Sequence, residues 1–147
     1  METRAKKLYG VIREVRTCFN HIKAVANEMH GDLKITASMR AVLESLEVTG
    51  ERTVPDIARS KGVSRQHIQK IVNTLSAAEL VAVNDNPGDK RTSLVSLTER
   101  GRESFREMKL RESAMLNSLG GMFPSDDMET TITTLRALTA SLKRQKT

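Results

Sequence analysis

The chain has 147 residues, with 24 Lys and Arg against 18 Asp and Glu, a single cysteine and 3% aromatic residues. This length suffices for one domain with its own core, the single cysteine excludes an intrachain disulfide framework, and no segment resembles a signal peptide or a membrane span, so we expect a cytoplasmic protein. The net charge of +6 suits a polyanionic partner, whereas scarce aromatics argue against binding by base stacking.

The first third of the chain predicts two helices. Apolar residues recur at helical, nearly heptad spacing over residues 4–30, and Gly31 ends this amphipathic run. Thr36 is suited to cap a second helix that stops at Gly50. The second helix has its apolar side at Met39, Val42, Leu43 and Leu46.

Two short helices follow, joined by a tight turn that contains a glycine. Thr53 and Ser64 are suited to cap them, and Asp56 is placed to complete a capping box with Thr53. The second of the two has its apolar side at Ile68, Ile71, Val72 and Leu75. Short helices connected in this way match a helix-turn-helix.

The charge pattern indicates which face of this motif would bind DNA. Residues 57–78 contain no Asp or Glu, so nothing in this stretch would repel phosphates. Side chains that suit base edges or phosphates lie opposite the apolar side of the second helix, with His67 in its first turn: Arg65, Gln66, Gln69, Lys70 and Asn73. The alternative is a solvated polar face without a ligand.

A β-hairpin is predicted next, with strands at residues 80–83 and 92–97. Its tip carries Lys90 and Arg91 among Asn, Pro, Gly and Asp, which taken alone is typical of a solvated turn. Directly after a helix-turn-helix, the hairpin completes a winged helix, and its two cations are interpreted as a second DNA contact on the backbone or in the minor groove.

Two further helices are predicted at the C-terminal end. Thr98 caps the first, which breaks at Gly120 and Gly121, and Ser125 opens the second, whose apolar line is Met128, Ile132, Leu135, Leu138 and Leu142. Amphipathic helices at both ends of a small chain need a partner surface, and a second copy is the simplest one. We therefore expect a mainly α fold with a small β-hairpin, as a single unit over 1–147: a winged helix-turn-helix at 36–98, flanked by dimerisation helices at 4–30 and 99–145.

The segments TVPDIARSKGVSRQHIQKIVNTLSAAELV and DKRTSLVSLTERG resemble the MarR family of winged helix-turn-helix bacterial transcription regulators. The resemblance implies a homodimer that binds a palindromic operator in double-stranded DNA, acting as a repressor, with Arg91 in the minor groove and Asp89 supporting the wing. The family usually has Gly where this chain has Glu79, and because Glu tolerates a left-handed helix end poorly, we expect that end to be shaped differently.

The resemblance also implies a small anionic or phenolic effector that releases the protein from DNA. Four methionines are candidates for an adaptable pocket, although Met at helical spacing is also typical of plain core: Met29, Met39, Met108 and Met115.

An enzyme is not expected, because the sequence contains no metal-binding or phosphate-loop motif and no cofactor or metal is implied. His21 and His30 lie off the apolar rows and are expected to be solvated. Architectural DNA binding and a protein-interaction module remain open, as does redox sensing. Some MarR relatives sense peroxide through a first-helix cysteine, but Cys18 falls in an apolar row, where burial would make it a packing residue.

Overall fold

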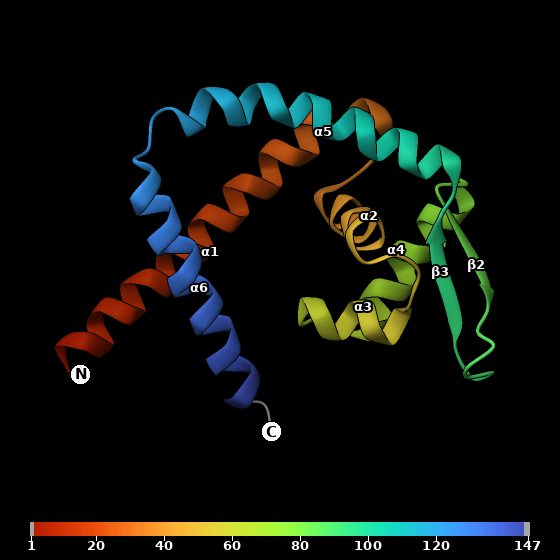
Figure 1. Cartoon of the computed structure of the whole chain (residues 1–147), viewed down its shortest axis with the longest axis horizontal. Coiled ribbons are helices and arrows are strands. Elements are labelled where there is room, and N and C mark those ends of the chain that lie inside the picture. The colour runs from red at the N-terminus through yellow and green to blue at the C-terminus, as the bar shows by residue number, and fades with distance from the viewer. Residues whose placement is uncertain (1, 146–147) are drawn as a thin grey trace. The chain divides into compact units, whose positions relative to one another are not determined.

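The computed structural model describes residues 2–145 and divides into two compact units, one reaching Met108 and the other starting at Lys109 (Figure 1). The elements of the first unit are α1 (Thr3–Met29), the 3-10 helix η1 (Gly31–Leu33), α2 (Ala37–Thr49), β1 (Arg52–Thr53), α3 (Val54–Lys61), α4 (Arg65–Ala77), β2 (Val81–Asp85) and β3 (Ser93–Leu97). Helix α5 (Glu99–Gly120) begins in the first unit and continues into the second, which also contains α6 (Ser125–Gln145). The predicted fold class, mainly helical with a winged helix-turn-helix, is confirmed.

Four predicted helix caps are present. The hydroxyl groups of Thr36, Thr53, Ser64 and Thr98 each accept a hydrogen bond from the backbone N–H three residues on, at 3.2, 3.2, 3.1 and 3.0 Å respectively. Each bond satisfies a donor that the first helical turn leaves unpaired, which typically stabilises a protein by about 1 kcal/mol. The starts of α2, α3, α4 and α5 are therefore fixed locally by the sequence.

The sheet is antiparallel, in the order β1-β3-β2. In the hairpin, Val81 pairs with Leu97 and Asp85 with Ser93, so β2 extends two residues beyond the predicted strand. The edge strand β1 pairs Arg52 with Val95 and was not predicted. Two residues are too few to show an alternating pattern, so β1 depends on the tertiary contact with β3.

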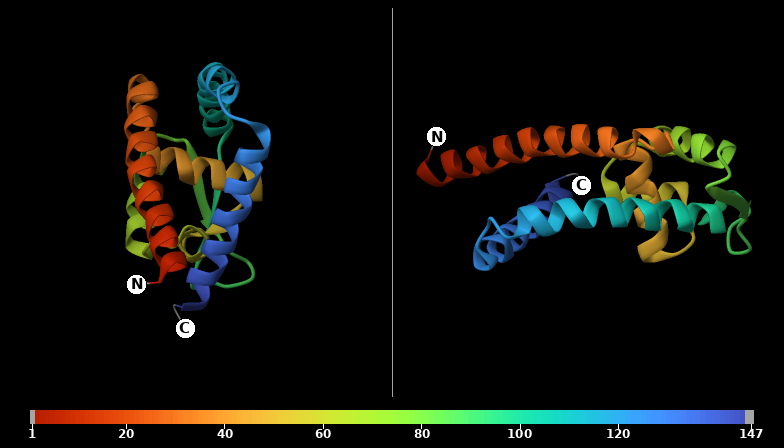
Figure 2. Two further views of the ribbon diagram at one scale, coloured as in Figure 1. Left: turned by 90° about the vertical axis from the view of Figure 1, so that its left-hand side faces the viewer. Right: turned by 90° about the horizontal axis from the view of Figure 1, so that it is seen from above.

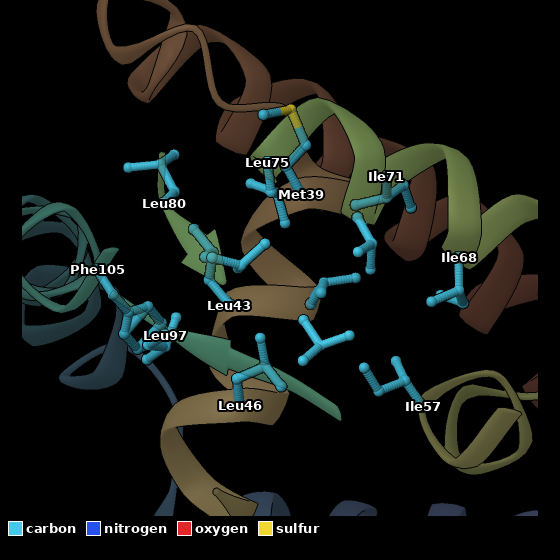
Figure 3. Packing of buried hydrophobic residues seen from close by; sticks show 14 of the residues in the cluster. Met39, Leu43, Leu46, Ile57, Ile68, Ile71, Leu75, Leu80, Leu97 and Phe105 are labelled. Carbon is cyan, nitrogen blue, oxygen red and sulfur yellow. The ribbon is translucent and has the colours of Figure 1, made fainter. Parts of the chain in front are cut away.

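The hydrophobic core joins the helices and the sheet of the first unit. Ile68, Ile71 and Leu75 of α4 point inward toward Leu43 and Leu46 of α2 (Figure 3). The whole cluster is Ile35, Met39, Val42, Leu43, Leu46, Ile57, Ala58, Ile68, Ile71, Val72, Leu75, Leu80, Val81, Val95, Leu97, Phe105 and Met108. All predicted inward positions of α2 and α4 are buried, so the period of the sequence pattern determines which face of each helix is exposed.

Two helices of the winged core end in the same hydrogen-bonded turn. After α3, Gly62 is left-handed and the N–H of Val63 donates to the carbonyl of Ala58 at 3.1 Å. After α4, Glu79 is left-handed with φ 61° and the N–H of Leu80 donates to the carbonyl of Leu75 at 2.9 Å. Both are Schellman motifs. The expectation that Glu79 would reshape this helix end was wrong, because burial of Leu75 and Leu80 on the same core holds the motif closed.

Helix α1 contains no buried residue, and most of its apolar side chains are exposed. Phe19 and Ile22 are each 62% exposed, and Cys18 is exposed as well. The expected burial of Cys18 is therefore wrong for the chain by itself, because nothing within residues 2–145 buries this side chain. Within the first unit, the start of α1 and the hairpin lie at opposite ends (Figure 2).

His21 is exposed, as predicted, but His30 is only 1% exposed and the prediction for it was wrong. The chain reverses at His30, whose carbonyl accepts from the N–H groups of Leu33 at 3.1 Å and Ile35 at 3.4 Å. The segment after α1 thus turns back toward His30. Periodicity within α1 could not reveal this burial, since it comes from outside that helix.

Candidate nucleic-acid interface

Helix α4 presents a polar face opposite its buried one. A helix turns by about 100° per residue, so the buried side chains fill one arc and the polar ones fill the opposite arc. All five side chains predicted on this face are exposed: Arg65, Gln66, Gln69, Lys70 and Asn73. The carboxamide of Gln69 donates to Oδ1 of Asn73 at 2.9 Å. The face combines two permanent cations with amide donors and acceptors, the groups that contact phosphates and base edges.

Three other predicted site residues lie at helix starts. The hydroxyls of Thr53 and Ser64 act as caps, and Thr53 is half-buried, whereas Ser64 and His67 are exposed. The N-terminus of α4 carries the positive end of the helix dipole, which favours an anion such as a phosphate. Ser64 and His67 therefore lie beside a locally positive end, while Thr53 has a structural role in starting α3.

The tip of the hairpin is ordered by its own short polar side chains. The Asn86 amide donates to the hydroxyl of Thr92 at 3.0 Å, and its Oδ1 accepts from the N–H of Gly88 at 3.0 Å. The Thr92 hydroxyl donates in turn to the carbonyl of Asp89 at 3.1 Å. These bonds span the turn, so the tip presents Lys90 and Arg91 from a defined backbone.

Asp89 holds Arg91 by three contacts. Its Oδ1 accepts from the backbone N–H of Arg91 at 3.0 Å and from Nε at 3.1 Å, while Oδ2 accepts from Nη2 at 3.4 Å. The side-chain hydrogen bond from Arg91, followed by the backbone one, lowers the pKa of Asp89 below 3.8. The Arg91 side chain is nevertheless 90% exposed. Asp89 therefore orients the guanidinium without burying it.

Arg52 connects the helix-turn-helix to α2 through hydrogen bonds, a role that was not predicted from the sequence. Its Nη1 donates to the hydroxyls of Ser45 at 2.9 Å and Ser60 at 3.3 Å, and its Nη2 donates to the carbonyl of Asp56 at 3.1 Å. One guanidinium thus ties α2, β1 and α3 together. The signal was absent from the sequence because Arg52 lies in the unpredicted strand β1.

Arg59, a cation within residues 57–78, is paired with an acidic side chain just outside that stretch. Its Nη1 lies 2.9 Å from Oδ1 of Asp56, one residue before the acid-free stretch. The hydrogen bond from Arg59, with a smaller one from Thr53, lowers the pKa of Asp56 below 3.8, so the carboxylate stays ionised at neutral pH. The cationic character of the candidate interface rests mainly on α4 and the wing.

The four candidate pocket methionines have different environments. Met39 and Met108 belong to the buried core, whereas Met29 and Met115 are half-buried. Met115 lies in the second unit. The core interpretation therefore applies to Met39 and Met108, and the effector pocket stays a prediction.

Within residues 2–145, no group of three or more His, Cys, Asp or Glu is arranged to hold a metal ion. No helix in that range is both long enough and apolar enough to cross a bilayer.

The comparisons with known proteins agree with this geometry. The model of the MarR family matches residues 35–92. The protein Rv2011c of Mycobacterium tuberculosis is 31% identical over 103 residues, which are 69% of this chain and 72% of the relative. The HTH-type transcriptional repressor NicR of Pseudomonas putida is 29% identical over 97 residues, 63% of this chain and 61% of NicR.

A solved structure shows the same fold over nearly its whole length. It is that of BpsR from Bordetella bronchiseptica, whose DNA binding is regulated by 6-hydroxynicotinic acid. The two chains are 25% identical with a TM-score of 0.76, over 88% of this chain and 98% of BpsR. With its matched winged helix-turn-helix and the exposed cations of α4 and the wing, the chain belongs to the MarR family of DNA-binding transcription regulators.

Proposed function

We propose that this protein is a sequence-specific repressor that binds a palindromic operator as a homodimer. Helix α4 enters the major groove, where Arg65, Gln66 and Gln69 reach base edges and Lys70 contacts a phosphate. The observation that carries the proposal is the exposed face of α4, which lies in a stretch without acidic residues and opposes a fully buried face. The repressor NicR supports the direction of regulation.

The wing supplies the second contact. Arg91 is exposed and oriented by Asp89, so it suits insertion into a narrow minor groove beside the site of α4. Lys90, next to it, is exposed and suits a phosphate. Contacts from both cations to phosphates would strengthen binding to DNA, and this contribution weakens as the salt concentration rises.

The dimer would cover the apolar faces that the chain leaves exposed. Phe19 and Ile22 of α1 and Leu142 of α6 are more than half exposed, at 62%, 62% and 51%. A second copy offers the same faces, and a two-fold dimer presents two reading helices to two half-sites. Such a regulator would act in the cytoplasm, where its DNA is.

A small anionic or phenolic effector is proposed to release the protein from its operator. The support comes from BpsR, whose DNA binding responds to 6-hydroxynicotinic acid. That compound, with nicotinic acid and salicylate beside it, is the first probe. Release of the selected operator by one of them, with a saturable dose response, supports the effector.

The experiment that tests the function is selection of binding sites from random duplex DNA, followed by binding of two variants. A regulator enriches a palindrome, and Arg65→Ala is expected to cost about 1 to 3 kcal/mol and to relax preference at one position in each half-site. Lys70→Ala is expected to weaken all sequences alike. Failure to enrich any sequence would instead favour an architectural DNA binder, and wild-type affinity and selectivity in Arg65→Ala would exclude α4 as the reader.

Redox sensing through Cys18 stays the second candidate, because the thiol is exposed rather than buried. Organic hydroperoxide is added to the wild type and to Cys18→Ser on the selected operator. Release from DNA that occurs only in the wild type would assign the sensor to Cys18. Retention of both proteins on DNA would leave Cys18 as an α1 surface residue.

A further inference from the structure

The amide pair in the middle of the α4 polar face carries a more specific inference. We propose that Gln69 reads an adenine in each half-site and that Asn73 is the positioning residue that holds Gln69 for this contact. The inference rests on the proposed function, since it assigns a base and a division of labour to the same reading helix.

The two residues lie on the exposed arc of α4, one turn apart. With 100° per residue, Arg65 falls toward one edge of the arc and Lys70 toward the other, and the amides lie between them. Ile68, Ile71 and Leu75 point from the opposite side of α4 into the core, which fixes the rotation of the helix (Figure 3). The amides therefore lie, with Gln66, on the part of α4 that a groove would meet.

The hydrogen bond between Gln69 and Asn73 leaves the two side chains with different donors and acceptors for DNA. A carboxamide has one acceptor oxygen and two N–H donors. Gln69 spends one N–H on Oδ1 of Asn73, at 2.9 Å, and keeps its Oε1 and its second N–H. An oxygen acceptor beside an N–H donor is the pair that recognises the N6 amino group and N7 of adenine.

Asn73 is left with the opposite character. Its oxygen is engaged by Gln69, and its two N–H groups remain as donors. One lone pair of that oxygen is taken by Gln69, so Asn73 offers a partly engaged acceptor beside its donors and is less suited than Gln69 to the acceptor-donor pair that adenine requires. Gln69 is thus the amide suited to contact the base, and Asn73 is the amide suited to position it. The hydrogen bond between them already restricts the rotamers of Gln69, so less rotamer entropy is lost when the protein binds DNA.

The test uses the full-length protein and the site obtained by selection. Affinities are measured for that site and for each single-base-pair variant of it, with the wild type, Gln69→Ala, Asn73→Ala and the double variant. We expect Gln69→Ala to reduce discrimination at one A·T pair by about fivefold or more. Asn73→Ala should reduce discrimination at the same pair, and the double variant should discriminate no worse than Gln69→Ala alone.

A conservative variant separates positioning from a general loss of structure. Asn73→Asp keeps an oxygen that accepts from Gln69 but removes the donors and adds a negative charge near phosphates. We expect lower affinity for every sequence with the A·T preference retained. Gln66→Ala, on the same face, is the matched control, and its effect should add to that of Asn73→Ala.

The outcomes are distinguishable. If selection enriches no sequence, the proposed function fails and this inference with it. If a site is enriched but the effects of Gln69→Ala and Asn73→Ala fall on different base pairs or add independently, the inference alone fails. Loss of the preference in Asn73→Asp as complete as in Asn73→Ala would also overturn it.

Discussion

At Glu79, a side chain occupies a left-handed position that glycine adopts without strain. Left-handed backbone costs a residue with a Cβ about 1 to 2 kcal/mol, while glycine in its place loses about 0.4 to 1 kcal/mol through the entropy of the unfolded chain. The Glu79–Arg100 ion pair, 3.5 Å apart and mostly exposed, contributes little. We therefore expect Glu79→Gly to raise the free energy of unfolding by up to about 1 kcal/mol, as measured by urea denaturation.

The control for this prediction is Glu79→Ala. It removes the same carboxylate but keeps a Cβ at φ 61°, so its stability should stay close to that of the wild type. A gain in Glu79→Ala equal to that in Glu79→Gly would assign the effect to charge. A loss of stability in Glu79→Gly would show that the left-handed position carries no strain.

Gly101, in the first turn of α5, is required for a close approach. A Cβ added there would collide with the carbonyl oxygen of Leu80 and lie 3.0 Å from its carbonyl carbon. Both atoms are backbone, and Leu80 is held by the N–H of Thr98, which donates to the same carbonyl at 3.2 Å. We expect Gly101→Ala to lower the free energy of unfolding by about 2 kcal/mol or more in urea denaturation. Gly120→Ala is the control, because nothing lies within 4 Å of its added Cβ and it should be tolerated.

The sequence predicts the role of a single residue when that role depends on near neighbours in the chain, and fails when it depends on distant segments. Caps at Thr36 and Ser64 depend on neighbours three residues away, so their residue type is sufficient. The burial of His30 occurs where the chain turns after α1, and the closed turn at Glu79 comes from core packing around it. Neither cause is local, and both predictions failed for that reason.

Among the elements, helix α4 was the most predictable and strand β1 the least. Thirteen residues give more than three turns of periodicity, enough to identify Ile68, Ile71, Val72 and Leu75 as the buried face. The amide pair on the other face was not predictable, because its members were each identified as DNA contacts and their mutual bond depends on rotamers. The bracing role of Arg52 likewise requires knowing that β1 forms.

In the wing, the carboxylate of Asp89 is hydrogen-bonded to the guanidinium of Arg91, and NMR can test this contact through the pKa of Asp89. The folded-state pKa of Asp89 lies below 3.8, mainly because of the hydrogen bond from the Arg91 side chain. A carboxyl group whose pKa is lowered by folding stabilises the folded state when the pH is above its ordinary, unfolded-state pKa. This stabilisation is lost as the pH falls through the lowered pKa. The wing contact should thus persist to a lower pH than the one at which an ordinary aspartate is protonated. We expect Arg91→Ala to raise the Asp89 pKa toward its ordinary range in a carboxyl titration, and an unchanged value would show that Arg91 is not its partner in solution.

The same arginine should be visible in the salt dependence of binding. If Arg91 neutralises one phosphate in each half-site, Arg91→Ala should flatten the slope of log affinity against log salt by about 0.9 per half-site and lower affinity at every salt concentration. Arg59→Ala is the control, because its guanidinium pairs with Asp56 at 2.9 Å and lies outside the proposed contacts. A slope that Arg91→Ala leaves unchanged would return the hairpin tip to a solvated turn.

At the scale of the whole molecule, the sequence predicts apolar stripes on α1 and α6 but cannot name what covers them. The structure leaves both helices without a buried residue. Exposed apolar surface of this extent indicates an interaction surface. The proposal of a second copy therefore needs a variant that changes assembly without changing the fold of the chain.

Ile22→Glu is that variant, because Ile22 is 62% exposed and lies outside the core cluster. In a two-fold dimer the change occurs twice, so two buried side chains are lost and two carboxylates are placed in an apolar interface. We expect dimerisation to weaken by about 3 kcal/mol or more, roughly a hundredfold in dissociation constant, as measured by analytical ultracentrifugation. Ala24→Glu adds the same charge two residues on, near the opposite side of α1, and should remain dimeric. The Ile22→Glu monomer should keep the circular dichroism of the wild type and bind a single half-site as weakly as it binds the full palindrome. A dimer of wild-type stability in Ile22→Glu would show that this face of α1 is not the interface.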